Sequence, residues 1–91
     1  MSNPQAEEVV NDLDVVFLTH IMSLKRAALM HLGVVDGSEG ELDLETAHHL
    51  IDVIEALKHK AQGNLSAAEV RQLEADLYEL KVAYVKVSGH G

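Results

Sequence analysis

The sequence predicts an all-α protein, a three-helix antiparallel bundle whose second and third helices form a hairpin. Three long segments of the 91-residue chain carry apolar residues at the helical spacing of three and four positions. Glycines stand at the ends of the first two segments, and no stretch shows the apolar–polar alternation that is typical of a strand. We expect one helical domain over residues 11–87, between a flexible N-terminal segment, 1–10, and a flexible tail, 88–91.

The first helix is expected to begin at Val9 or Asn11 and to end at Leu32. Gly33 follows it, and a glycine in this place commonly stops a helix by adopting a left-handed conformation. At about 100° per residue, the apolar side chains of this helix form one wide arc, made up of Phe17, Leu18, Ile21, Met22, Leu24, Ala28, Leu29 and Leu32. This arc predicts a face that is buried against other helices.

The second helix is expected to begin after Asp43, a good N-cap residue, and to end at Gln62 before Gly63. Its apolar residues gather on one side of the helix: Leu44, Ala47, Leu50, Ile51, Ile54, Leu57 and Ala61. The glycine opens a short turn over residues 63–65, which predicts a hairpin with the third helix.

The third helix is expected to start at Ser66, because Ser66 and Glu69 have the spacing of a capping box, and to end near Val87. It carries two apolar stripes. The first has heptad spacing and consists of Val70, Leu73, Leu77, Leu80, Tyr84 and Val87. The second lies about 100° or more around the helix and consists of Ala75, Tyr78, Val82 and Val85.

A helix with two apolar stripes needs two neighbours, and the apolar area of the first and third helices exceeds what three short helices readily cover. The sequence therefore predicts a homodimer that completes its core across a two-fold axis. The expected self-association interface consists of Ala75, Tyr78, Val82, Val85, Phe17, Ile21 and Leu24. A compact three-helix monomer is the alternative.

Charge excludes some partners and suggests another. Acidic residues outnumber Lys and Arg by 15 to 7, a net charge of −8, so nucleic acid is not expected as a partner. Residues 1–45 hold nine acids and two bases, a net charge of −7. The acids cluster at Asp36, Glu39, Glu41, Asp43 and Glu45. An acidic surface of this kind predicts attraction to a basic protein partner.

We expect a cytoplasmic protein that is not an enzyme. No secretory signal is visible, and the apolar stretch over residues 13–35 is interrupted by Asp14, Lys25 and Arg26, which argues against a membrane span. There is no cysteine and no nucleophile or phosphate-binding motif, so neither a catalytic residue nor a cofactor is predicted. The leading interpretation is an interaction and oligomerisation module with an acidic surface.

Two alternative functions remain open. The first is a divalent-metal site on the second helix, where His48, Asp52, Glu55 and His59 follow one another at i, i+4, i+7 and i+11. Imidazole and carboxylate groups at this spacing can bind zinc or a similar ion, although the line lies on the polar side of the helix. The second alternative is a helical regulator that binds a small ligand in a cavity between its helices.

The chain resembles the bacterial family called domain of unknown function 1844, over about residues 14–87. The residues that carry the resemblance are Ser23-Leu24, Ala28 to Gly33, Asp43 to Ala47, Ile51-Asp52, Leu57, Lys60 to Leu65, Glu69, Leu77 to Leu80 and Tyr84-Val85. The resemblance implies a small all-helical protein with no assigned reaction or cofactor. His48 and His49 lie outside the matching pattern, whereas His31 lies within it.

Overall fold

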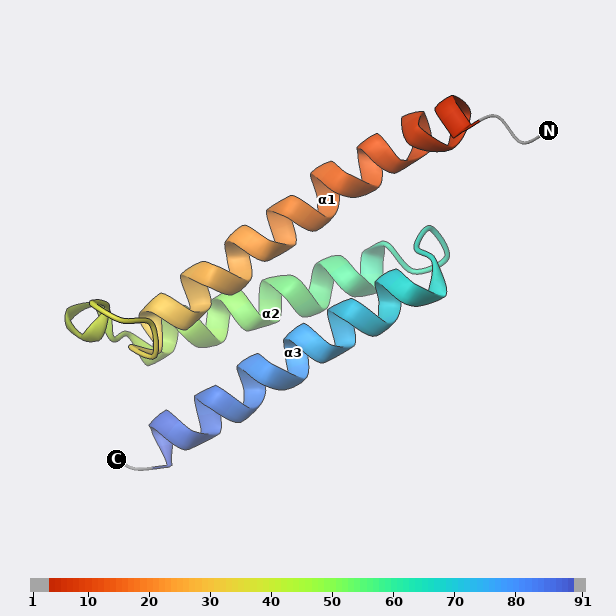
Figure 1. Ribbon diagram of the computed structural model, residues 1–91. Helices are drawn as coiled ribbons and strands as arrows, with labels where there is room; N and C mark the ends of the chain where they lie inside the picture. Colours follow the sequence, from red (N-terminus) through yellow and green to blue (C-terminus); the bar gives the residue numbers. More distant parts are fainter. Residues whose placement is uncertain (1–3, 90–91) are drawn as a thin grey trace.

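The structure is a computed structural model that describes the backbone of residues 4–89 and the side chains from residue 13 onward. It contains three α-helices, α1 (Pro4–His31), α2 (Leu44–Lys60) and α3 (Ala67–Ser88), and one turn of 3₁₀ helix, η1 (Glu39–Glu41). Each helix runs antiparallel to the one before it (Figure 1). The all-α, three-helix prediction is confirmed. Residues 1–3 and 90–91, at the ends that the sequence predicts to be flexible, lie outside the described residues.

The predicted start of the first helix, Val9 or Asn11, is wrong, because α1 begins at Pro4. Residues 4–10, expected as a segment before the helical domain, therefore belong to the helix. Proline is well suited to a first helical turn, since its fixed φ is helical and its missing N–H would have no partner there. With 28 residues at about 1.5 Å each, α1 is about 42 Å long.

Gly33 ends α1 as the sequence predicts, with a left-handed φ of 72°. The amide of Gly33 donates to the carbonyl of Met30, and that of Val34 donates to the carbonyl of Leu29, the two bonds of a Schellman motif. The following loop is tied back to the helix by a hydrogen bond of 2.7 Å from the Asp43 amide to the carbonyl oxygen of His31. The end of α1 and the start of α2 are thus joined directly.

The predicted caps of the other two helices are also confirmed. Asp43 accepts a hydrogen bond of 3.1 Å from the amide of Thr46 at the start of α2. Ser66 and Glu69 form the reciprocal capping box of α3, with bonds of 3.1 and 2.7 Å. The second helix ends at Lys60, two residues before the expected Gln62.

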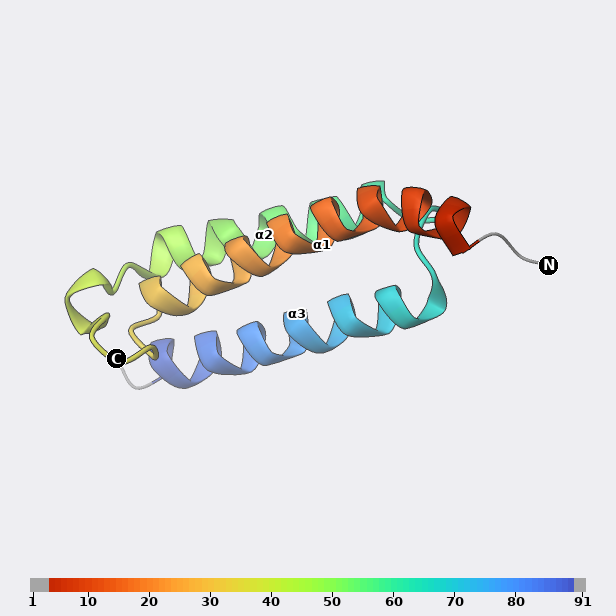
Figure 2. The same cartoon turned by 45° about the horizontal axis from the view of Figure 1, so that its top comes forward.

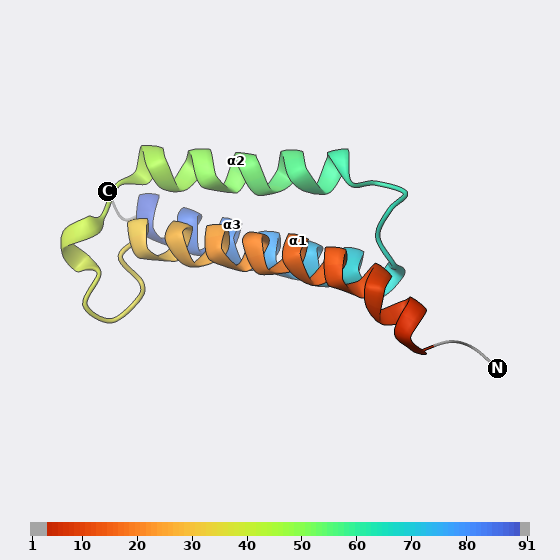
Figure 3. The same ribbon diagram turned by 90° about the horizontal axis from the view of Figure 1, so that it is seen from above.

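The core lies along the line where the three helices meet. Its buried apolar residues are Ile21 and Ala28 of α1, Leu32 directly after α1, Ala47, Ile51 and Ile54 of α2, and Leu73, Leu77 and Leu80 of α3. Helix α2 packs extensively on α1 and also on α3, whereas α1 and α3 meet over less of their length (Figures 2 and 3). One side of the bundle, between α1 and α3, therefore stays open. In the described part of the chain, no helix is long and apolar enough to cross a membrane.

Candidate functional site

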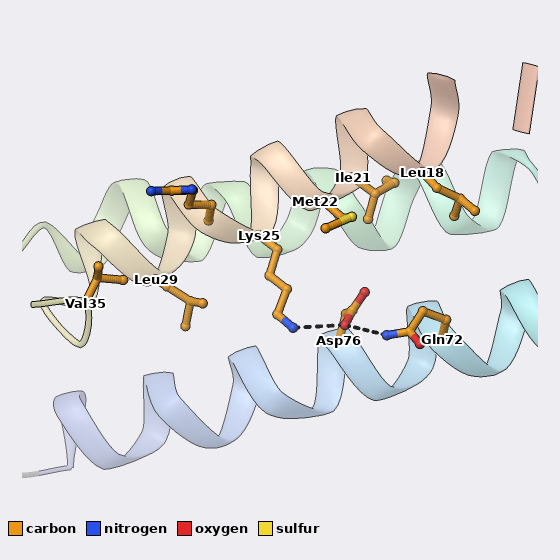
Figure 4. A pocket seen from close by; sticks show the side chains of 9 residues that line it. Leu18, Ile21, Met22, Lys25, Leu29, Val35, Gln72 and Asp76 are labelled. Atoms are coloured by element: carbon orange, nitrogen blue, oxygen red, sulfur yellow. Dashed lines mark hydrogen bonds and ion pairs between the residues drawn. The ribbon is translucent and has the colours of Figure 1, made fainter. Parts of the chain in front are cut away.

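A groove of about 580 Å³ runs between α1 and α3 on the open side of the bundle (Figure 4). It is lined by Leu18, Ile21, Met22, Lys25, Arg26, Leu29, Val35, Gln72 and Asp76. Most of its wall comes from α1, because the apolar arc of that helix is wider than the surface that the core covers. We name this feature the α1–α3 groove.

One polar cluster crosses the α1–α3 groove. The Nζ atom of Lys25 lies 3.0 Å from Oδ1 of Asp76 and 2.9 Å from Oε1 of Glu79. Gln72 donates a further hydrogen bond of 3.0 Å to the same Asp76 oxygen. Asp76 is almost fully buried, so this carboxylate depends on the lysine and the amide for its charge compensation.

The environment of Lys25 keeps the lysine protonated. Partial burial alone would lower its pKa, but the hydrogen bonds to Glu79 and Asp76 and the charges of both carboxylates raise the pKa of Lys25 above its ordinary value. The lysine is therefore a fixed cation between the two helices, and its ammonium group is directed at α3 rather than at solvent (Figure 4).

This cluster was not predicted from the sequence, although a signal for it was present. Lys25 lies within the apolar arc of the first helix, one turn after Ile21 and one turn before Leu29. Asp76 lies directly beside the buried Leu77 of the heptad stripe. A cation and an anion at the edges of two core faces indicate an ion pair between the helices.

The two apolar stripes of α3 have different surroundings. The heptad stripe faces the core as expected, with its central residues, Leu73, Leu77 and Leu80, buried. The second stripe, which we name the outer stripe (Ala75, Tyr78, Val82 and Val85), lies on the surface. Tyr78 is 72% exposed and Val85 is 64% exposed. A shallow hollow of about 460 Å³ connects Tyr78 and Val82 to Val34, next to the wall residue Val35 of the α1–α3 groove.

The three residues of α1 that were expected in the interface are covered to different extents within the single chain: Ile21 is buried, and Phe17 and Leu24 are half-buried. Ile21 is 1% exposed and belongs to the core of the single chain, and Phe17 and Leu24 pack against that core. Periodicity shows how wide an apolar arc is but not which part of it each neighbour covers. The most exposed part of the predicted arc and its surroundings carries Val15 and Met22, which are 57% and 66% exposed.

The structure does not bring the predicted metal-binding line together around one point. His48 Nδ1 lies 3.2 Å from Asp52 Oδ2, but Glu55 accepts a hydrogen bond of 2.6 Å from Lys81 of α3. That bond lowers the pKa of Glu55. Within the described residues, no group of three or more His, Asp or Glu side chains could hold a metal ion. His48 instead stacks edge-on against Tyr84 at 5.5 Å.

The predicted acidic cluster lies at the surface of the loop between α1 and α2 and of the first turn of α2. All its members are exposed: Asp36, Glu39, Glu41, Asp43 and Glu45. Asp43 also has a structural role, because the hydrogen bonds from Thr46 that cap α2 lower its pKa. The other carboxylates remain available to a partner.

These features define a small three-helix bundle with an apolar groove crossed by one ion-pair cluster, an exposed outer stripe and an acidic loop. The model of the family described as domain of unknown function (DUF1844) matches residues 14–86. The chain therefore belongs to this family, as the resemblance implied. The match spans both the groove and the outer stripe. No curated protein and no solved structure matches the chain significantly.

Proposed function

We propose that this chain is a non-enzymatic, cytoplasmic helical module that self-associates and presents its acidic loop to a basic protein partner. One observation carries the proposal: large apolar side chains of α1 and α3, among them Met22, Tyr78 and Val85, are exposed beside open hollows. Monomeric proteins rarely leave contiguous apolar surface of this kind in water. The cytoplasmic location remains a prediction of the sequence.

The size of the chain supports self-association. A domain of this length buries a smaller fraction of its surface than a larger one, and the buried core of the described residues consists of nine aliphatic side chains. A second copy would cover the α1–α3 groove or the outer stripe and add apolar contact area to each chain. Each exposed side chain that becomes buried in this way stabilises the assembly by about 1.5–3 kcal/mol.

The acidic loop supports the second part of the proposal. Its exposed carboxylates lie on the connection between α1 and α2, outside both the α1–α3 groove and the outer stripe. A module that self-associates through those apolar surfaces would keep this charge free. A basic partner bound there should dissociate more readily as salt is raised, because exposed charges are screened within about 10 Å at 0.1 M ionic strength.

The experiment is native mass spectrometry on the untagged chain, beside a Met22→Glu/Val85→Glu variant that places a carboxylate on each apolar surface. Ala56→Glu is the matched control, because Ala56 is exposed on α2. We expect a dimer for the unaltered chain and the control, and a monomer for the double variant. A single-copy mass for the unaltered chain at the highest concentration at which it stays in solution would contradict the proposal.

A small-ligand function is the second candidate, because the volume of the α1–α3 groove lies within the range of about 300–1,000 Å³ that is typical of ligand sites. Its apolar walls and the basic side chains Lys25 and Arg26 suit an apolar molecule with an anionic end. The same mass spectra test this idea, since a copurified ligand adds mass to the unaltered chain. That added mass should disappear in a Leu18→Glu/Leu29→Glu variant and persist in Ala56→Glu.

A further inference from the structure

The part of α1 beside the core, on the side of the α1–α3 groove, carries its own heptad pattern. Val15, Leu18, Met22, Lys25 and Leu29 follow one another at spacings of three, four, three and four. The last four line the α1–α3 groove. Such spacing forms a seam along which two helices can pack side by side. We name these five residues the α1 seam.

The length of α1 exposes the beginning of this seam. Helix α1 has 28 residues and α2 has 17, so α1 is longer by about 16 Å at about 1.5 Å per residue. Its N-terminal turns reach past the turn between α2 and α3 (Figure 3). Leu13, Val15 and Val16 are exposed in this region. Val15 belongs to the α1 seam, whereas Leu13 and Val16 lie on the opposite side of the helix.

Charge is ordered along the same helix. Residues 1–24 contain four acids and no Lys or Arg, and Lys25 and Arg26 follow as the first bases of the chain. Arg26 is exposed at the wall of the groove. Lys25 is already paired with Asp76 and Glu79, so Arg26 is the base that can face a partner. Two such helices laid parallel would set acid against acid, whereas two laid antiparallel can bring Asp14 of each near Arg26 of the other.

In the single chain, the environment of Asp14 in this acidic half is unfavourable for its ionised carboxylate. Desolvation and the neighbouring carboxylate of Glu69, at the start of α3, raise the pKa of Asp14. Two carboxylates therefore come together beside the N-terminal half of α1, about three turns before Arg26. A basic group brought to this place by another molecule would relieve their repulsion.

We propose that a second copy of the chain docks through the α1 seam, with the two α1 helices antiparallel across a two-fold axis that passes near residue 20. This inference rests on the proposed self-association and names its contact. Leu18 then lies opposite the partner's Met22, and Val15 lies opposite the partner's Lys25. Registers shifted by one heptad keep the seam in contact, but this register sets Asp14 of each chain opposite the partner's exposed Arg26.

The test uses the absence of cysteine from the chain. Leu18→Cys and Met22→Cys are made separately, mixed, oxidised and compared with each variant alone on a non-reducing gel. We expect the mixture to give several times more disulfide-linked dimer than either variant alone, because only residues 18 and 22 lie opposite each other. Ala56→Cys, exposed on α2, is the control that should not link. Circular dichroism verifies that each variant is helical.

A second measurement avoids the half-buried Leu18. Arg26→Glu should raise the dimer dissociation constant about fivefold at low salt, because each dimer loses two favourable contacts between unlike charges. Arg71→Glu makes the same charge change at an exposed position of α3 and should leave the dissociation constant unchanged. Equal effects of the two variants would overturn the inferred order of charges.

Other outcomes distinguish a failure of this inference from a failure of the proposed self-association. Linkage of Met22→Cys with itself in excess of the mixture would indicate parallel helices or an antiparallel pair centred on residue 22, and either arrangement would overturn the inference. A dimer that links through Val85→Cys and not through α1 would also overturn it, while leaving self-association intact. A monomeric unaltered chain would remove the inference and the proposed function together.

Discussion

Lys25 of α1 and Asp76 of α3 form an ion pair of 3.0 Å at the place where these two helices come together beside the core. The side chain of Asp76 is 9% exposed, so it has few water molecules to replace a lost partner. Gln72 of α3 supports the same oxygen from the neighbouring turn. The position of α3 beside α1 therefore depends on a charge interaction as well as on apolar packing.

Replacing Lys25 with methionine should lower the free energy of unfolding by about 1–3 kcal/mol, because a buried carboxylate loses its charged hydrogen-bond donor. Urea denaturation measures the change. Lys81→Met is the control, since Lys81 pairs with Glu55 where both side chains are well exposed, and it should cost less than about 1 kcal/mol. Equal losses in the two variants would show that the groove does not strengthen the Lys25–Asp76 pair.

Replacing Asp14 should change the free energy of unfolding by an amount that depends on pH. Its pKa in the folded state is raised from the ordinary value of 3.8, so the ionised folded state is penalised at pH 7 and the penalty vanishes once the group is protonated in both states. Asp14→Asn should raise the free energy of unfolding at pH 7 and lose this advantage as the pH falls below 3.8. Thermal unfolding at pH 7 and pH 3 measures both values.

Asp36→Asn provides the comparison for Asp14, because Asp36 is an exposed acid of the loop. It removes the same charge at a distance from Glu69. An advantage of Asp14→Asn that persists unchanged at pH 3 would contradict the electrostatic explanation.

Gly33→Ala should destabilise the chain by about 1–2 kcal/mol, because an alanine at a φ of 72° brings its Cβ too close to the backbone. Space is not the cause, since the nearest atom to the added Cβ would be a Leu42 carbon at 3.8 Å. Gly40→Ala is the matched control: it has no left-handed φ and no atom within 4 Å of the added carbon. Its midpoint of thermal unfolding should equal or exceed that of the unaltered chain.

Ser66→Ala should cost about 1 kcal/mol, since it removes the side-chain acceptor that caps α3. Ser23→Ala is a suitable comparison, because the Ser23 hydroxyl bonds only to the carbonyl oxygen of Thr19 one turn earlier in α1. Such a bond adds little to a helix. Urea midpoints that fall by the same amount in both variants would contradict the role of the cap.

Local signals explain why much of the fold could be predicted. Gly33, Asp43 and Ser66 act on the backbone within a few residues of themselves, so the sequence alone places the helix ends that they control. The start of α1 at Pro4 escaped prediction because apolar periodicity is absent from the first turns of that helix. A proline at a first turn was the available signal.

The surface was harder to predict, because exposure depends on which neighbour covers each part of a helix. The outer stripe of α3 was correctly separated from the core stripe, since the two lie on different sides of one helix. Ile21 and Met22 belong to the same apolar arc, yet the first is buried and the second is exposed. Only the direction from which α2 approaches α1 decides between them.

The loop between α1 and α2 influences which helices lose their backbone hydrogen bonds first. The Asp43 amide is bonded to the carbonyl oxygen of His31, and His31 Nδ1 lies 3.0 Å from the carbonyl oxygen of Glu41. These links fasten α2 to α1, whereas α3 meets α1 over less of its length. Cooperative units of a protein exchange amide hydrogens separately when their local stabilities differ. Deuterium should therefore enter the amides of α3 first, while the α1–α2 pair stays protected as one unit.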